Sequence, residues 1–207
     1  MSSRRLSCSV NEEAVATLRR DPVMDRLIDR FGPLVVEPVE NPCRRLCVSI
    51  LNQQLSTASA AAIRERAFDV IGDDVLPETV LAADPDRLAE AGVSRTKIEY
   101  LRSAAETFGT GEPALSREAL ADRNDGEVRR ELTRIHGVGE WTARMYLIFA
   151  LGREDVLPLG DLAVRKGIES VYNDENELSR AEMRDIADAW RPYRSYGTRY
   201  VWAAYES

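Results

Sequence analysis

The sequence predicts an all-α fold. Apolar residues recur at spacings of three and four along most of the 207 residues, whereas the alternation typical of strands is scarce. Capping residues and glycine or proline stops bracket many of these segments. A hydrophobic content of 44% over this length supports one or two compact units, each with a core.

The first elements follow from apolar spacing and capping. Residues 1–40 are expected to form a short helical lead-in. After Asn41-Pro42, five residues share one face of a helix: Cys43, Leu46, Cys47, Ile50 and Leu51. The three cysteines lack CxxC spacing, so neither a disulfide framework nor a metal site is indicated, and Cys43 and Cys47 are expected in the core. Ser56 is the expected cap of the next helix, which ends before Gly72.

Turn signals divide the rest of the chain. Asp84-Pro85 and Gly92 bracket a short helix, and Ser94 opens another that ends at Gly109. A polar passage precedes the helices expected at residues 125–135 and 140–151. An extended connection then runs from Gly152 to Asp161, and capping-box spacing at 179–182 opens a helix that ends before a final aromatic helix at the C-terminus.

The formal net charge of −7 argues against a nucleic-acid partner, because polyanion binding usually requires a basic domain. A solvated acidic shell can nevertheless coexist with a local basic groove. The only lysines are Lys97 and Lys166, so arginine supplies the other positive side chains. The sequence shows no leader peptide and no membrane-crossing apolar run, which predicts a cytosolic protein without a membrane partner.

The most informative stretch is Leu132-Thr-Arg-Ile-His-Gly-Val-Gly-Glu-Trp-Thr-Ala143. Two helical patterns are joined there by a Gly-hydrophobic-Gly turn, in which glycine permits positive φ and close approach of another backbone. The amides of Gly137, Val138 and Gly139 would face an anion at the start of the second helix. An ordinary helix-turn-helix corner also uses glycine, so the turn alone leaves both interpretations open.

The whole block resembles the helix-hairpin-helix of the base-excision DNA glycosylase superfamily. In that superfamily a Gly/Pro-Asp motif follows the hairpin, and its aspartate drives base excision; the matching segment here is Asp155-Val-Leu-Pro-Leu-Gly-Asp161. The resemblance implies that Asp161 is the catalytic carboxylate, and the same residue is placed to cap a helix. Asp155 is expected to serve the structure.

Further segments resemble the 3-methyladenine DNA glycosylase II group: Leu51-Asn-Gln-Gln-Leu-Ser56, the Trp141-Thr-Ala block, and Trp190-Arg-Pro-Tyr-Arg-Ser195 through Trp202. Many relatives carry a Schiff-base lysine where this chain has Trp141, so the resemblance implies a monofunctional enzyme that leaves an abasic site. No cofactor is expected, because the cysteine spacing for an iron–sulfur cluster is missing.

The resemblance also assigns the substrate and DNA contacts. Trp141 and Trp202 would line the base pocket, since indole faces attract a cationic alkylated purine, although core packing is the usual fate of tryptophan. Met145 stands where the relatives have a pocket tyrosine, with Tyr146 beside it. Thr142 and the loop Gln53-Gln54-Leu55 would contact DNA; Gln54 is the expected wedge that fills the space of a flipped base, and Leu55 is the alternative. Backbone carbonyls of Thr133, Ile135 and Val138 would hold a monovalent cation.

These expectations describe one two-lobed domain over residues 1–207, with a cleft between lobe 41–150, which contains the hairpin at 132–143, and lobe 1–40 plus 151–207. Its partner is double-stranded DNA with a damaged base, and a monomer is expected. The expected reaction is hydrolysis of the N-glycosidic bond of alkylated purines of the 3-methyladenine and 7-methylguanine type. Two alternatives stay open: another lesion, such as uracil, mismatched thymine or an oxidised purine, and a DNA-binding module without activity.

Overall fold

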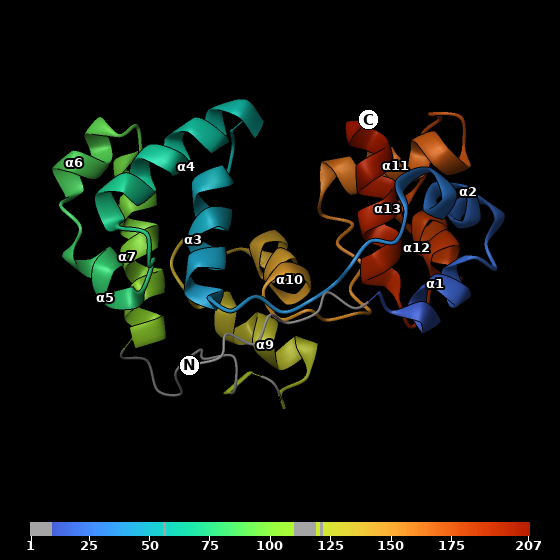
Figure 1. The fold of residues 1–207 in the computed structure, drawn as a ribbon, viewed down its shortest axis with the longest axis horizontal. Helices are drawn as coiled ribbons and strands as arrows, with labels where there is room; N and C mark the ends of the chain where they lie inside the picture. Colours follow the sequence, from blue (N-terminus) through green and yellow to red (C-terminus); the bar gives the residue numbers. More distant parts are fainter. Residues whose placement is uncertain (1–9, 56, 110–118, 121) are drawn as a thin grey trace. The chain divides into compact units, whose positions relative to one another are not determined.

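The computed structural model describes residues 10–55, 57–109, 119–120 and 122–207, with the backbone alone at 57 and 58. All regular elements in these ranges are helices, which confirms the all-α prediction (Figure 1). The chain divides into two compact units: unit 1 comprises Met1–Glu37 and Arg153–Ser207, and unit 2 comprises Pro38–Gly152. The expected lobes, 41–150 and 1–40 plus 151–207, have nearly these bounds, and the cleft between them stays a prediction.

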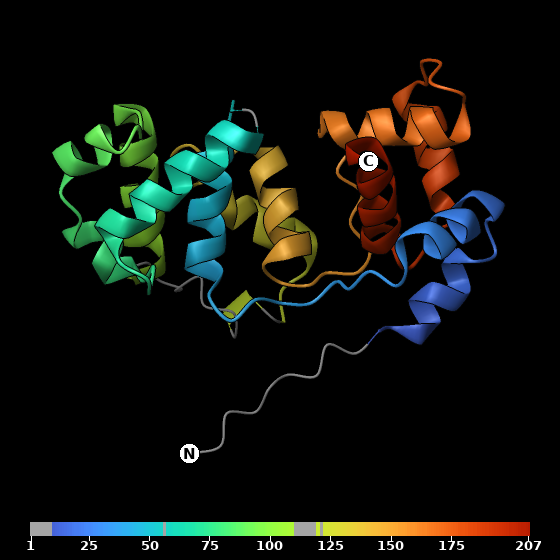
Figure 2. The same ribbon diagram turned by 45° about the horizontal axis from the view of Figure 1, so that its top comes forward.

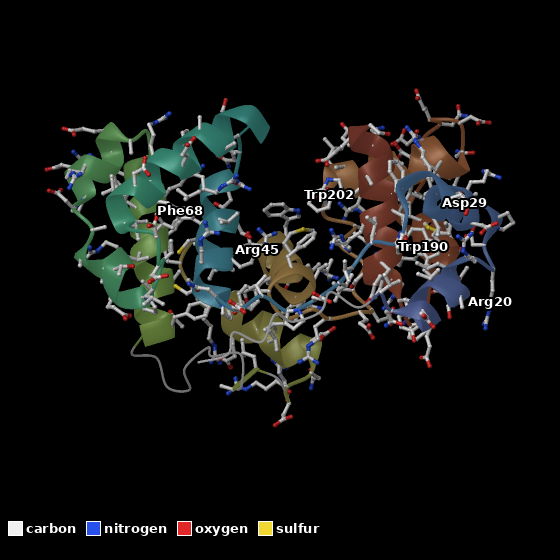
Figure 3. All side chains as sticks on the ribbon, in the orientation of Figure 1. Arg20, Asp29, Arg45, Phe68, Trp190 and Trp202 are labelled. Atoms are coloured by element: carbon white, nitrogen blue, oxygen red, sulfur yellow. The ribbon has the colours of Figure 1, made fainter. Side chains whose placement is uncertain are left out.

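Unit 1 joins the two ends of the chain. Its helices are α1 (Glu12–Leu18), α2 (Pro22–Phe31), α11 (Leu162–Tyr172), α12 (Arg180–Asp188) and α13 (Arg194–Glu206). Helix α13 contacts α2, α11 and α12, and Figure 2 shows the blue N-terminal helices beside the red C-terminal helix. Fully buried Trp190, labelled in Figure 3, packs directly over Gly197 of α13, where a β-carbon would overlap the indole ring.

Unit 2 is arranged around α3. Its helices are α3 (Pro42–Asn52), α4 (Thr57–Ile71), α5 (Pro77–Ala82), α6 (Pro85–Glu90), α7 (Arg95–Gly109), α9 (Asp125–Leu132) and α10 (Glu140–Phe149). Figures 1 and 2 show α3 with α7 on one side and α10 on the other. The apolar face predicted for this segment is its core face, since Leu46, Cys47, Ile50 and Leu51 have no exposed surface.

The predicted helix starts agree with the structure where they can be compared. Asp84 accepts hydrogen bonds from the Asp86 and Arg87 amides, and Ser179 forms the capping box with Glu182. Ser56 and residues 110–118 lie outside the described residues, so the cap expected at Ser56 stays a prediction. Within the described ranges, no helix combines the length and hydrophobicity of a membrane span.

Candidate active site and DNA interface

The predicted hairpin connects α9 to α10 in unit 2, and its two glycines have different roles. Gly137 has φ +84°, and a β-carbon there would overlap the ring of Tyr100 on α7. Gly139 has φ −92° and ψ 177°, which is extended backbone that any residue adopts. The positive φ that glycine permits is therefore used at Gly137 and not at Gly139, because Gly139 is the N-cap of α10 and N-caps are extended.

The start of α10 is open. A β-carbon on Gly139 would meet no described atom within 4 Å, and Gly139, as the N-cap residue, has no side chain that could accept from the first-turn amides. Glu140 is the acidic residue of this turn; its carboxylate is 3.2 Å from Arg129 Nε and 3.8 Å from Arg144 Nε. These two guanidinium groups offset its charge, so the turn keeps the partial positive charge of a helix N-terminus.

The loop Gln53–Leu55 lies against the hairpin within unit 2. The Gln53 side-chain amide donates to the Gly137 carbonyl at 3.0 Å and to the Thr142 hydroxyl at 3.3 Å. Gln54 is exposed with φ 57°, and Leu55 is one of the few exposed large apolar residues. The structure therefore brings the predicted wedge loop and the predicted phosphate-binding turn together. Thr142 is 2% exposed, so its hydroxyl is used inside the unit.

The expected base-contacting residues of α10 do not share one environment. Met145 and Tyr146 are 2% and 0% exposed, and the Tyr146 ring lies at 55° to the Phe108 ring with 6.3 Å between the ring centroids. Burial raises the pKa of the Tyr146 hydroxyl. This placement argues against direct contact of either side chain with a base, because both belong to the core of unit 2. Trp141, at the start of the same helix, is half-buried.

Asp161 lies in unit 1 as the N-cap of α11. Its Oδ1 accepts a hydrogen bond from the Val164 amide at 3.0 Å, and its side chain is at the positive end of the helix. The residue is 7% exposed. The capping role predicted from the sequence is confirmed, and the catalytic role stays a prediction. Trp202 is half-buried on α13 in the same unit (Figure 3).

Asp155 anchors the connection that leads to Asp161. Its carboxylate accepts two hydrogen bonds from Arg194, Nε to Oδ1 at 2.6 Å and Nη2 to Oδ2 at 3.0 Å, and a third from Arg191 at 2.9 Å. The Ser195 hydroxyl adds a hydrogen bond to the Arg153 carbonyl at 2.6 Å. The expectation that Asp155 serves the structure is confirmed, because this bidentate pair fixes the connection to α13.

The other end of the connection is fixed by helix packing. A β-carbon on Gly167 of α11 would overlap the Val201 carbonyl of α13, so these helices approach at backbone distance. The Asp161 amide donates to the Pro158 carbonyl at 2.8 Å and closes the turn before α11. The Asp161 carboxylate is therefore held at the start of α11, a helix that packs closely against α13.

Two further expectations concern the hairpin. The Ile135 carbonyl accepts a hydrogen bond from the Val138 amide at 3.0 Å, which leaves one of its lone pairs for a cation, and the monovalent-cation site stays a prediction. Sequence reasoning missed Lys97, whose ammonium donates to two carbonyls at the end of α3. The only signal was the rarity of lysine, since Lys97 and Lys166 are the only two in a chain that otherwise uses arginine.

Sequence comparison assigns most of the chain to one family. Residues 47–192 match the HhH-GPD superfamily of base excision DNA repair proteins. A Schizosaccharomyces pombe protein named DNA-3-methyladenine glycosylase 1 is 29% identical over 86% of this chain and 78% of its own length. A Bacillus subtilis protein named putative DNA-3-methyladenine glycosylase YfjP is 28% identical over 84% of this chain. The chain spans 62% of the length of that relative and 64% of a second one from B. subtilis.

Solved structures agree with the sequence comparison. A DNA-3-methyladenine glycosidase from Bacillus halodurans superimposes with a TM-score of 0.80 and 32% identity, covering 96% of this chain and 92% of that one. The 3-methyladenine DNA glycosylase of S. pombe in complex with abasic DNA also gives a TM-score of 0.80, with 28% identity over 92% of this chain and 95% of that one. With its hairpin and its aspartate-capped helix, the chain belongs to the HhH-GPD superfamily of base excision DNA repair proteins.

Proposed function

We propose that the chain is a monofunctional DNA glycosylase that removes alkylated purines, of the 3-methyladenine and 7-methylguanine type, from double-stranded DNA. The observation that carries the proposal is the buried Asp161 carboxylate at the start of α11, in a chain whose 32%-identical structural relative is a DNA-3-methyladenine glycosidase. The relative from S. pombe with abasic DNA supports the expected product class.

The proposed reaction is hydrolysis at C1′ of the damaged nucleotide. As the N-glycosidic bond breaks, positive charge develops on the sugar, and the Asp161 carboxylate stabilises that charge. A water molecule adds to C1′, and its proton passes to the carboxylate or to solvent. The electron pair of the broken bond goes to the purine. Because alkylation at a ring nitrogen makes the base cationic, it departs neutral and needs no general acid.

The hairpin supports the DNA-binding part of the proposal. Neither the φ of residue 139 nor its packing against described residues requires a glycine there. Close approach of a DNA backbone would explain why the position has no side chain. The first-turn amides of α10, which follow an N-cap residue without a side chain, suit a phosphate oxygen, and main-chain donors hold DNA without reading its sequence. Trp202, half-buried in the unit that carries Asp161, is the indole that we assign to the cationic base.

The two lysines support the absence of lyase chemistry. Lys97 donates to the carbonyls of Leu51 and Gln53 at 2.7 and 2.8 Å. Lys166 is 2.7 Å from the buried Glu169 carboxylate, which raises the pKa of its ammonium and keeps it protonated. A Schiff base requires an amine that is free to attack, and both of these ammonium groups are held in other contacts. We therefore expect an intact strand after base release.

The test is incubation of the full chain with duplex DNA that contains one methylated purine. The proposal expects free methylpurine in solution and a strand that breaks only after alkali. Parallel duplexes with uracil, mismatched thymine or 8-oxoguanine measure the alternative lesions. Preferred release of one of these bases would mean that the substrate is that lesion and not an alkylated purine. DNA binding without release of any base would refute the proposed glycosylase activity and favour a non-catalytic DNA-binding module.

A further inference from the structure

Lys97, near the start of α7, connects three parts of unit 2. Its ammonium donates to the Leu51 carbonyl at 2.7 Å and to the Gln53 carbonyl at 2.8 Å, at the point where α3 ends and the loop Gln53–Leu55 begins. The Gln53 side chain continues from there to the Gly137 carbonyl of the hairpin at 3.0 Å. Lys97 thus holds the backbone at the start of the loop, and the hairpin holds the Gln53 side chain.

The chemistry of these contacts favours a fixed loop. The last carbonyls of a helix lack intrahelical donors and carry partial negative charge, so a cation is a favourable partner. Charge-assisted hydrogen bonds are shorter and stronger than neutral ones. The next residue, Gln54, has φ 57°. Residues other than glycine rarely adopt this backbone conformation unless the surrounding structure holds it. Lys97 supplies part of that constraint.

The side chains at the tip of this loop face outward. Gln54 is exposed, and Leu55 is 37% exposed although leucine is usually buried. A side chain that enters a duplex in place of a base must displace a stacked and paired nucleotide. A loop that is already ordered does this without a further loss of conformational freedom.

We propose that Lys97 is a positioning residue for base eversion, holding the loop Gln53–Leu55 against the hairpin in the conformation that enters the duplex. The inference rests on the proposed glycosylase function and adds to it a residue that acts through the loop Gln53–Leu55 rather than on the reacting atoms. It predicts that loss of Lys97 slows excision of a paired base while leaving the hydrolytic step intact.

The experiment compares paired with unpaired lesions. Single-turnover excision is measured for 7-methylguanine opposite cytosine and for 7-methylguanine opposite an abasic site, where eversion needs little unpairing. The variants are Lys97→Met, which removes the charge, and Lys97→Arg, which restores a donor cation. Arg102→Met is the matched control, because Arg102 lies on the same helix and donates to the Leu81 carbonyl near the end of α5 at 3.1 Å.

The expected result for Lys97→Met is a fall of about tenfold on the paired lesion, equivalent to about 1.4 kcal/mol, and of less than about twofold on the unpaired one. Lys97→Arg should recover most of the paired rate, and Arg102→Met should leave the ratio of the two rates unchanged. An equal fall on both lesions, or no fall, would overturn the inference. If Lys97→Met melts below the assay temperature, Lys97→Gln, which removes the charge and keeps a polar side chain, carries the same comparison.

A second readout separates this inference from the proposed function. Fluorescence of 2-aminopurine placed next to the lesion reports unstacking without chemistry, and the signal should be smaller for Lys97→Met than for the wild type. If the wild type releases no base from either duplex, the proposed function fails. If the wild type releases base and Lys97→Met matches it in rate and fluorescence, only the role of Lys97 fails.

Discussion

Substituting Gly137 by alanine should destabilise unit 2 by about 2–5 kcal/mol. The left-handed backbone at φ +84° costs a residue with a β-carbon about 1–2 kcal/mol. The β-carbon also overlaps the Tyr100 ring, and overpacking of this kind costs about 1–3 kcal/mol. Because whole domains are stable by only about 5–15 kcal/mol, the loss is measurable by urea unfolding at equilibrium.

The two contributions can be separated in a second background. Tyr100→Ala removes the ring, so adding Gly137→Ala to it should cost only the backbone part, about 1–2 kcal/mol. An equal cost of Gly137→Ala with and without the Tyr100 ring would refute the argument from overlap. A cost below about 0.5 kcal/mol in both backgrounds would refute the argument from φ as well.

Gly139 gives the opposite expectation. Gly139→Ser should leave stability unchanged or raise it, because φ −92° suits serine and serine is a better N-cap than glycine. Its hydroxyl would take the α10 amides that a phosphate needs, so DNA affinity should fall about tenfold, the equivalent of a hydrogen bond to a charged group. Fluorescence anisotropy with duplex DNA at fixed salt measures this. Unchanged affinity would contradict the assignment of the anion site.

Three further outcomes are expected. Asp155→Ala should lower the unfolding free energy by about 1–3 kcal/mol, because it leaves the 17%-exposed Arg194 without its carboxylate partner. The control Asp188→Ala, on the surface, should change the unfolding free energy by less than about 0.5 kcal/mol, and thermal melts compare the two variants. Borohydride added during turnover should trap no protein–DNA adduct, and a covalent band on a denaturing gel would refute the monofunctional mechanism. The hydrogen bond from Lys166 lowers the pKa of Glu169 in the folded state. The stability that this contact adds is present above about pH 4.3, the unfolded pKa, and should be lost as the pH falls through the lower folded pKa. In unfolding measured between about pH 5 and 2, Glu169→Gln should therefore show a smaller loss of stability with falling pH than the wild type.

Local signals in the sequence were sufficient for most of the fold. Capping residues such as Ser179, and the apolar face of residues 43–51, act within one helix, so they can be seen without tertiary information. Helix α5 was missed, because Leu76 provides no capping side chain before Pro77 and the usual start signal is lacking. The hairpin was found from its glycines, yet sequence could not distinguish positive φ at Gly137 from extended backbone at Gly139.

The candidate site was predictable only where a motif coincided with a local structural role. Asp161 has such a role as the cap of α11. The burial of Met145 and Tyr146 depends on which face of α10 packs against α3 and α9. Residues that are adjacent in a helix point in different directions, so this face depends on tertiary packing. Lys97 lies more than forty residues from its partners, so its contacts depend on the packing of α7 against α3.

The most direct test of the central claim is single-turnover excision by Asp161→Asn. Asparagine caps a helix as well as aspartate, so melting temperature and DNA affinity should stay near wild type, while loss of the negative charge should slow base release by about 100-fold or more. Asp84→Asn makes the same exchange at the cap of α6 and should leave the rate unchanged. Release of methylpurine by Asp161→Asn within a few-fold of the wild-type rate would contradict the account.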